Sequence, residues 1–210
     1  MADFPEKRLR RLRTSQKIRE LIQEVSISPK DLICPVFVEE GIEAKKQVNS
    51  MPAIERLPLS EVVNEVNTIS ELGIPAIMSH SAKHRSNFYS PFRDAAECAP
   101  QFSDRRTYQV PFTNPREAMR EVETDINEGV DIVMIKPALT YLDLISETRR
   151  KFNVPVAAYS VSGEYALVKG AAMQGWIDEE EMTKEILYSI KRAGADMIVT
   201  YFAKHIAEKL

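Results

Sequence analysis

The feature that most constrains this chain's fold is the alternation of strand-like and helix-like segments from residue 115 onwards. Short apolar runs are followed by segments with apolar residues at helical spacing. The runs lie at 130–137, 154–161 and 195–202, and the helical segments at 115–129, 140–152, 179–194 and 203–210. Strands that alternate with helices predict a parallel sheet with helices on its outside. The runs are apolar almost throughout, as strands buried on both faces are. We therefore expect an α/β fold.

The first half of the chain adds two further strands. Residues 31–41 read as an apolar strand broken by Pro35, and residues 74–83 as a second strand that ends near Lys83. Between them, residues 58–73 have helical periodicity and a glycine stop. We expect about five strands in one domain, 31–210, preceded by a basic N-terminal arm, 1–30. The stretch 84–115 has little periodicity, and loops of that length are usually functional.

Charge and composition exclude several classes of function. The formal net charge of the 210 residues is −3, and 44% of them are hydrophobic, which is typical of a soluble globular protein and gives no nucleic-acid or membrane bias. No apolar run approaches the ~20 residues of a membrane helix, and the N-terminus resembles no signal peptide. The two cysteines, Cys34 and Cys98, lie far apart without metal-ligand spacing. We expect reduced thiols in a cytoplasmic protein.

Polar residues gather at the ends of the expected strands, where parallel α/β folds bind ligands. Lys83 and Lys136 each end a strand, and residues 159–165 and Tyr201 follow two others. A lysine is a nucleophile only when neutral, and a neighbouring cation lowers its pKa. Two lysines close together could therefore form an imine with a carbonyl. Arginines of the long loop, Arg93, Arg105 and Arg106, could pair with a carboxylate.

Simpler interpretations exist for each residue. Lys136 could be the point where a strand meets solvent, and Tyr201 could only pack. Ser162 and Gly163 could form a turn with Glu164 as its cap. The convergence of these residues on one edge of the sheet favours a site.

The same residues carry a family resemblance that covers nearly the whole chain. The segments "DLICPVFVEEG", "SAKHRSNFYSPFRDAA", "DRRTYQV", "VMIKPALTYLD", "YSVSGEYAL" and "RAGADMIVTYFA" resemble porphobilinogen synthase, also called 5-aminolaevulinate dehydratase. The resemblance implies a TIM (β/α)8 barrel, a lyase that condenses two 5-aminolaevulinate molecules through lysine Schiff bases in tetrapyrrole (haem) biosynthesis. It also implies a homo-oligomer, an octamer or hexamer, in which the N-terminal arm wraps a neighbouring subunit.

The resemblance assigns the two lysines and the groups around the second substrate. Lys136 of "MIKP" resembles the lysine that holds the first substrate, and Lys83 of "SAK" the one that holds the second. Arg93, Arg105 and Gln109 resemble the groups around the second substrate's carboxylate.

Other residues resemble the first substrate's surroundings and a metal site. Ser162 and Tyr201 resemble the binders of the first substrate's carboxylate, and Tyr159 a neighbour of the imine. Magnesium or zinc is expected for the family. Glu121 is a weak candidate for a non-catalytic magnesium, because a helix glutamate beside Arg120 is more often a solvated charge.

The chain also departs from the family's pattern. The units that carry the catalytic-metal ligands are missing near residues 76–79, and neither Cys34 nor Cys98 replaces those ligands. Five strands cannot close an eight-stranded barrel, so apolar side chains of the remaining strands should be exposed. Ser90 and Ser103 stand where the family usually has glycine, and serine would cost stability if these positions need a positive φ.

Three functions remain open. The first is porphobilinogen synthase, or a shortened member that captures substrate at Lys136 with little turnover if the metal segment is absent. The second is another lysine-dependent aldolase or dehydratase. The third is a non-catalytic family member that binds other chains in an assembly. A full protein with residues that this sequence lacks is favoured over a working five-strand enzyme, because the joint is abrupt. A truly shortened protein could complete its core by pairing with another chain.

Overall fold

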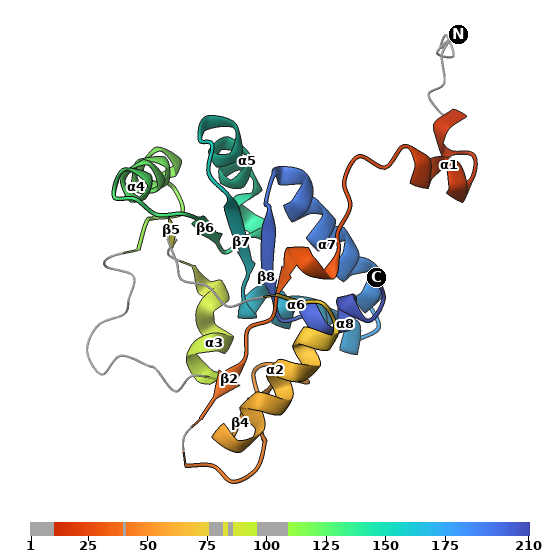
Figure 1. Cartoon of the computed structure of the whole chain (residues 1–210), viewed down its shortest axis with the longest axis vertical. Coiled ribbons are helices and arrows are strands. Elements are labelled where there is room, and N and C mark those ends of the chain that lie inside the picture. The colour runs from red at the N-terminus through yellow and green to blue at the C-terminus, as the bar shows by residue number, and fades with distance from the viewer. Residues whose placement is uncertain (1–10, 40, 76–81, 84–85, 96–108) are drawn as a thin grey trace.

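A five-stranded parallel sheet forms the centre of the computed structural model (Figure 1), which describes residues 11–39, 41–75, 82–83, 86–95 and 109–210. The strand order is β1-β8-β7-β6-β5, and every neighbouring pair is parallel. The strands are β1 (Leu32–Ile33), β5 (Ala82–Lys83), β6 (Val133–Lys136), β7 (Val156–Ser160) and β8 (Met197–Thr200). The predicted α/β class and parallel sheet are confirmed. Most of the strand expected at 74–83 lies outside the described residues.

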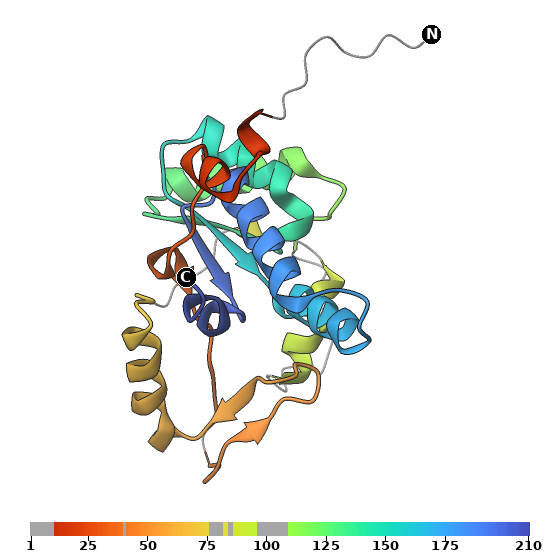
Figure 2. The ribbon, with the colours of Figure 1, turned by 90° about the vertical axis from the view of Figure 1, so that its right-hand side faces the viewer.

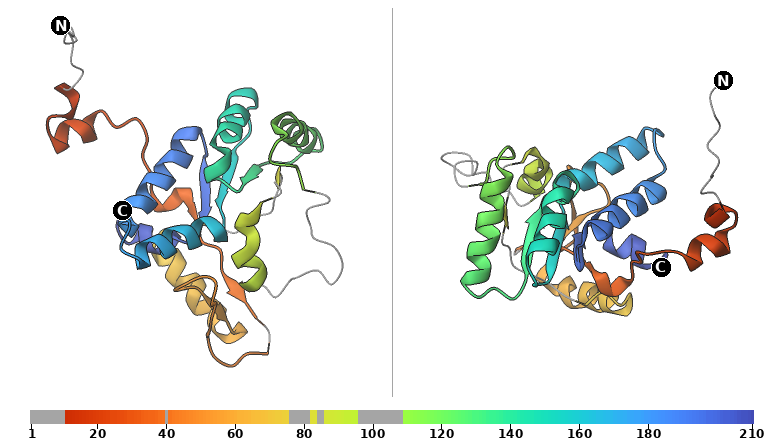
Figure 3. Two further views of the ribbon diagram at one scale, coloured as in Figure 1. Left: turned by 180° about the vertical axis from the view of Figure 1, so that it is seen from behind. Right: turned by 90° about the horizontal axis from the view of Figure 1, so that it is seen from above.

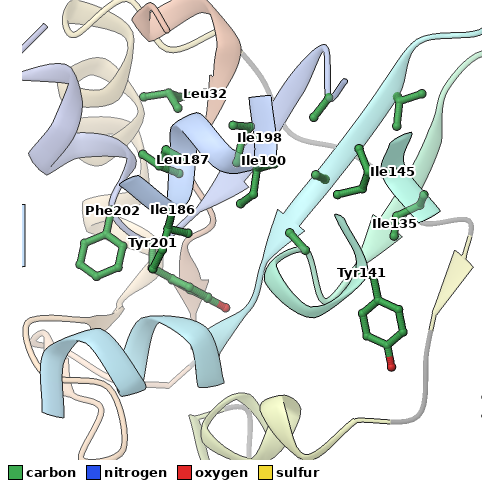
Figure 4. Close-up of a cluster of buried hydrophobic side chains, with 14 of the residues drawn as sticks. Leu32, Ile135, Tyr141, Ile145, Ile186, Leu187, Ile190, Ile198, Tyr201 and Phe202 are labelled. Atoms are coloured by element: carbon green, nitrogen blue, oxygen red, sulfur yellow. The ribbon is translucent and has the colours of Figure 1, made fainter. Parts of the chain in front are cut away.

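One face of the sheet packs against helices. Successive side chains of a strand point to opposite faces, so Leu32, Ile135 and Ile198 share the helix-covered face. Figure 4 shows this cluster, in which Ile145, Leu187 and Ile190 of the helices lie beside the strand residues. The covering helices are α4 (Pro115–Asn127), α5 (Leu142–Lys151) and α7 (Glu179–Ala193). The core of the molecule therefore lies between the sheet and these helices, as the sequence predicts.

The opposite face carries a second, smaller apolar cluster. It consists of Ile33, Met134, Ala157 and Val199, each at most 5% exposed. The expectation that a partial barrel exposes these side chains is wrong for this face. The four side chains pack on one another and on partly buried neighbours from the same strands, which removes them from water. By the same alternation, Lys136 lies on this second face.

Residues 31–41 form two strands in different sheets, not the single strand that the sequence predicts. β1 belongs to the main sheet, and β2 (Phe37–Val38) pairs with β4 (Glu55–Leu57), which also pairs with β3 (Lys46–Gln47). Pro35 lies between β1 and β2, and proline has no N–H to donate to a sheet. The break expected at Pro35 thus moves the chain to a second sheet.

The remaining helices lie around these sheets. The helix predicted at 58–73 is a 3₁₀ turn, Leu59–Glu61, followed by α2 (Val62–Glu71). The others are α1 (Gln16–Leu21), α3 (Ser90–Ala95), α6 (Ser162–Met173) and α8 (Ala203–Ala207), with 3₁₀ turns at Arg11–Arg13, Pro29–Asp31, Asn87–Tyr89 and Leu139–Tyr141. The sequence did not predict α6. Ser90 has φ −58°, a helical value, so this position does not need a positive φ and its serine causes no strain; Ser103 lies outside the described residues.

The sheet is an open part of a barrel. Within the described residues, β1 and β5 each pair on one side only, and Figure 3 shows the helices on the outside of the curved sheet. α1 has no buried residue and stands apart from the body in Figures 1 and 3, as an arm does; in the view of Figure 2 it lies in front of the body. Among the described residues, no helix is both long and apolar enough to cross a membrane.

The start of α7 offers a test of the local sequence signals. Asp178 precedes the helix, and its Oδ1 accepts a hydrogen bond from the Glu181 N–H at 2.9 Å. Losing such a cap costs about 1 kcal/mol. We expect Asp178→Ala to lower the free energy of unfolding by that amount in urea denaturation. The matched control is Glu185→Gln on the exposed face of the same helix, which should change it by less than ~0.5 kcal/mol. Equal effects would contradict the capping role.

Candidate active site

The two lysines singled out by the sequence end neighbouring strands. The register of β5 and β6 pairs Lys83 with Lys136. Neighbouring strands lie about 4.8 Å apart, so the two backbones are adjacent at the carboxyl ends of the strands. The side chain of Lys83 lies outside the described residues. The fold therefore brings together two residues that are 53 positions apart in the sequence.

Lys136 is a buried lysine. It is 6% exposed, so the interpretation that its strand simply ends in solvent is wrong. Its Nζ lies 5.6 Å from the centroid of the Tyr159 ring, within the range of a cation–π contact. Its backbone carbonyl accepts a hydrogen bond from the Tyr89 hydroxyl at 3.0 Å. These contacts hold both the backbone and the amine end of Lys136 beside an aromatic surface.

Tyr159, whose ring the amine contacts, is hydrogen-bonded to a second tyrosine. The hydroxyls of Tyr159 and Tyr201 are 3.1 Å apart, and the Tyr201 ring is stacked on Phe37 at 5.9 Å between centroids. Burial raises the pKa of Tyr159 to about 12, and burial together with Tyr159 also raises the pKa of Tyr201. Both therefore stay protonated at neutral pH. A hydroxyl pair that shares one hydrogen bond keeps one proton to donate to a further acceptor.

Three residues are expected to bind the carboxylate of the second substrate, and the structure describes the side chain of one of them, Gln109. Gln109 is 5% exposed, and its buried Oε1 has no hydrogen-bond partner among the described residues. An unpaired buried amide oxygen is costly, and this acceptor would be satisfied by a ligand group that donates a hydrogen bond, which an ionised carboxylate does not. Arg93 lies on α3, with its side chain outside the described residues, and Arg105 lies outside them entirely. Their expected roles remain predictions.

Ser162 already has hydrogen-bond partners within the protein. Its Oγ accepts from the Phe92 N–H at 2.9 Å and donates to the Phe88 carbonyl at 3.2 Å. A hydroxyl has a single proton to donate. To donate to a substrate carboxylate, as the resemblance implies, the Ser162 hydroxyl must therefore leave Phe88. That role stays a prediction.

Glu164 is a site residue that sequence reasoning described only as a turn cap. It is 1% exposed, and its carboxylate accepts from the backbone N–H of Leu139 at 2.5 Å and of Val161. Burial raises its pKa to about 7, and these backbone donors partly oppose the shift. The cap interpretation explains the Val161 bond, but nothing in the sequence pattern indicated the bond to Leu139. Tyr89 and Phe37 were also missed, because their contacts join distant segments.

The described residues do not fit a catalytic metal. No group of three or more His, Cys, Asp or Glu side chains lies together in the part of the chain that the structure describes. Burial raises the pKa of the Cys34 thiol to about 11, whereas metals bind the thiolate. Glu121 is exposed on α4, and Cys98 lies outside the described residues. The family's metal therefore has no identified site here.

The parallel sheet, its external helices and a buried lysine at the strand ends define a barrel-type α/β protein with a candidate Schiff-base site. The family model described as delta-aminolevulinic acid dehydratase matches residues 6–78 and 75–209. The chain belongs to this family, which is also called porphobilinogen synthase and consists of lyases of tetrapyrrole biosynthesis. The resemblance seen in the sequence is confirmed.

Individual relatives agree with the family match. Delta-aminolevulinic acid dehydratase of Archaeoglobus fulgidus is 36% identical over the full length of both chains. That of Staphylococcus aureus (strain Mu50) is 47% identical over 82% of this chain and 52% of its own. The crystal structure of the Toxoplasma gondii ME49 enzyme with its product porphobilinogen has a TM-score of 0.92 and 27% identity, covering 98% of this chain and 92% of that chain.

The alignments also contain an internal gap. The one with the Archaeoglobus fulgidus protein has 323 positions, and the chain has 210 residues, so at least 113 positions have no residue of this chain opposite them. The two segments that match the family model meet at residues 75–78. The chain therefore resembles its relatives on both sides of a missing internal block.

Proposed function

We propose that this chain captures 5-aminolaevulinate as an imine on Lys136, the lysine chemistry of porphobilinogen synthase. The observation that carries the proposal is the position of Lys136. It is buried at the carboxyl end of β6, on the face of the sheet opposite to α4, α5 and α7, and its register partner is Lys83. Solvated surface lysines lack such surroundings. The choice of 5-aminolaevulinate as the substrate follows from the family to which the chain belongs.

The capture step needs an unprotonated amine and a ketone. Lys136 Nζ forms a bond to the keto carbon, and the two hydrogens of the amine leave with the carbonyl oxygen as water. The ring of Tyr159 lies beside the amine, and a proton of the Tyr159–Tyr201 hydroxyl pair can be donated to the substrate carboxylate. The aromatic surroundings limit access of water, which favours the dehydrated imine.

The second substrate is assigned to Lys83. The pairing of β5 with β6 supports two imines at neighbouring positions, with Gln109, Arg93 and Arg105 as expected carboxylate ligands. A metal is general in the family, but the described donors do not fit one, and no step of this proposal depends on it. The proposal is limited to the capture of the two substrates.

Intact-mass spectrometry after mixing with 5-aminolaevulinate and sodium borohydride tests the proposal. Borohydride adds a hydride to the imine carbon and, with one proton on nitrogen, leaves a stable secondary amine. We expect one or two substrate adducts on a chain of 23.9 kDa, with tryptic peptides that place the first on Lys136. Pyruvate, a ketone without the aminolaevulinate chain, is the control. An adduct absent at Lys136, or equally abundant with pyruvate, overturns the proposal.

The N-terminal arm favours assembly as a second function. α1 has no buried residue, and its Leu21 side chain is 83% exposed. An apolar side chain so exposed suits a contact with another chain. We propose that the arm joins copies of this chain, or full-length relatives, in an oligomer. Light scattering of the purified protein should give a mass several times 23.9 kDa, and removal of residues 1–26 should reduce it to that of a single chain.

The cytoplasmic location is part of the same proposal. It is supported by the two well-separated cysteines and by the biosynthetic role of the family. Reduced Cys34 fits this location, because its half-buried thiol has a raised pKa and resists oxidation.

A further inference from the structure

The first turn of α6, residues 162–164, contacts two separate loops of the site, and we name it the SGE turn. One loop follows Lys136, and the other, residues 86–92, follows Lys83. Ser162 and Glu164 contact these loops through their side chains, and Gly163 lies close to one of them because it has no side chain. The sequence placed these residues in an ordinary turn.

Glu164 holds the loop after Lys136. Leu139, whose N–H donates to this carboxylate, is three residues beyond Lys136, and the Ala138 backbone also donates to it. Burying a carboxylate is unfavourable unless hydrogen bonds compensate. The start of α6 needs only the Val161 bond. The bonds to residues 138 and 139 therefore have a different consequence: they fix the backbone that leaves the reactive lysine.

Ser162 and Gly163 hold the loop after Lys83. The Ser162 hydroxyl joins the Phe88 carbonyl to the Phe92 N–H. A Cβ at Gly163 would lie 2.5 Å from both the Cα and the carbonyl oxygen of Phe88. Because those are backbone atoms, any other residue at 163 must displace the loop. This close approach places Phe92, and with it the backbone of Arg93, against α6.

The two loops also touch each other at the lysine. Tyr89, in the middle of the second loop, donates its hydroxyl to the Lys136 carbonyl. Displacement of residues 86–92 would therefore remove this contact and shift Arg93, while the bonds of Glu164 would remain. Loss of the Glu164 bonds would release the loop after Lys136 and leave the Phe88 contact intact. The two halves of the SGE turn are thus separable by mutation.

We propose that the SGE turn is a positioning device that holds the two substrate-capturing halves of the site through different residues, with Glu164 fixing the loop after Lys136 and Ser162–Gly163 fixing the loop after Lys83. The inference rests on the proposed function for its link to substrate. The claim that the SGE turn fixes each of the two loops selectively does not depend on that function. None of the three residues needs to contact the reacting atoms for this role.

Borohydride trapping with peptide mapping tests the link to substrate. In Glu164→Gln, which keeps the size of the side chain but loses an acceptor, we expect the initial rate of trapping at Lys136, relative to Lys83, to fall about tenfold. In Gly163→Ala, we expect the opposite change in the ratio. Gly170→Ala on the same helix, where an added Cβ meets nothing within 4 Å, is the matched control, and Glu147→Gln on α5 is the control for the lost carboxylate. Both should leave the ratio unchanged.

Hydrogen exchange of backbone amides separates this inference from the proposed function. Glu164→Gln should speed exchange of the Leu139 amide about tenfold and leave Phe92 unchanged, and Gly163→Ala should do the reverse. If Gly163→Ala does not fold, Ser162→Ala removes the two hydrogen bonds without adding an atom, and only its amide exchange is compared, because Ser162 is also an expected binder of the first substrate's carboxylate. Selective exchange without any adduct in the wild type retains the positioning role and rejects the proposed function. Uniform changes at both amides, or equal loss of both adducts, overturn the inference and leave a merely structural role.

Discussion

Lys136→Met is expected to abolish the substrate adduct, lowering the initial rate of borohydride trapping by at least about a hundredfold to the background of surface lysines. Methionine has a length and flexibility similar to those of lysine but no amine, so it cannot form an imine. The side chain is 6% exposed, and its end lies over the ring of Tyr159. An apolar replacement should therefore keep the fold. Intact-mass spectrometry with peptide mapping provides the measurement.

A matched variant shows whether the loss is specific to the site. Lys184→Met removes a lysine of α7 that pairs with Glu180 at 2.7 Å on the surface. That variant should trap substrate at the wild-type rate, because exposed ion pairs contribute little to stability and Lys184 lies on a helix, not at a strand end. Adducts that persist at full rate in Lys136→Met would reject Lys136 as the captor and assign the reaction to another lysine.

The place of Lys136 in the candidate site could be predicted from the sequence, because a local pattern indicates where in the fold this lysine lies. An apolar strand that ends in a lysine, repeated at Lys83, places both residues at the ligand-binding edge of any parallel sheet. The strand at 130–137 becomes β6, and those at 154–161 and 195–202 become β7 and β8, each trimmed at both ends. Periodicity predicts the buried centre of a strand well, whereas its ends depend on hydrogen bonds to neighbours.

Contacts between distant segments could not be predicted in the same way. The bond from Leu139 to Glu164 and the bond from Tyr89 to Lys136 join loops that are far apart in the sequence. α6 was missed because its first turn contains Gly163, and because it carries buried residues on several sides and so lacks a clear apolar stripe. Glycine normally disfavours helices, but here it allows the close approach of Phe88. A tertiary requirement thus overrode the local preference.

The division of residues 31–41 has a similar origin. The sequence showed an apolar run with a proline in it, and a single broken strand was the simplest interpretation. In the structure, Ile33 pairs with Val199 of the main sheet, whereas Phe37 pairs with Arg56 of the small one. The redirection places the Phe37 ring on Tyr201 and completes the aromatic surroundings of the tyrosine pair. Whether residues 31–41 form one strand or two depends on the strands with which they pair, and the apolar run itself does not indicate those partners.

Glu164 should also make the stability of this protein depend on pH. The folded-state pKa of about 7 lies above the ordinary value of 4.5, and burial is the main cause. Below pH 4.5 the carboxyl is protonated in both the folded and the unfolded chain. Between pH 4.5 and 7 the folded chain keeps a proton that the unfolded chain releases, so the free energy of unfolding falls as pH rises. Above pH 7 the carboxyl is ionised in both states, and the free energy of unfolding no longer falls because of this group.

We therefore expect the free energy of unfolding of the wild type, relative to Glu164→Gln, to fall by on the order of 2–3 kcal/mol between pH 5 and pH 8. Urea denaturation of both proteins at several pH values measures the difference, in which the titration of other groups cancels. Asp31 does not interfere, because its pKa is lowered from 3.8 and its stabilising pair with Lys191 is lost only at more acidic pH. A constant difference across this range would mean that the carboxylate is ionised throughout. The backbone donors at 138, 139 and 161 would then outweigh burial.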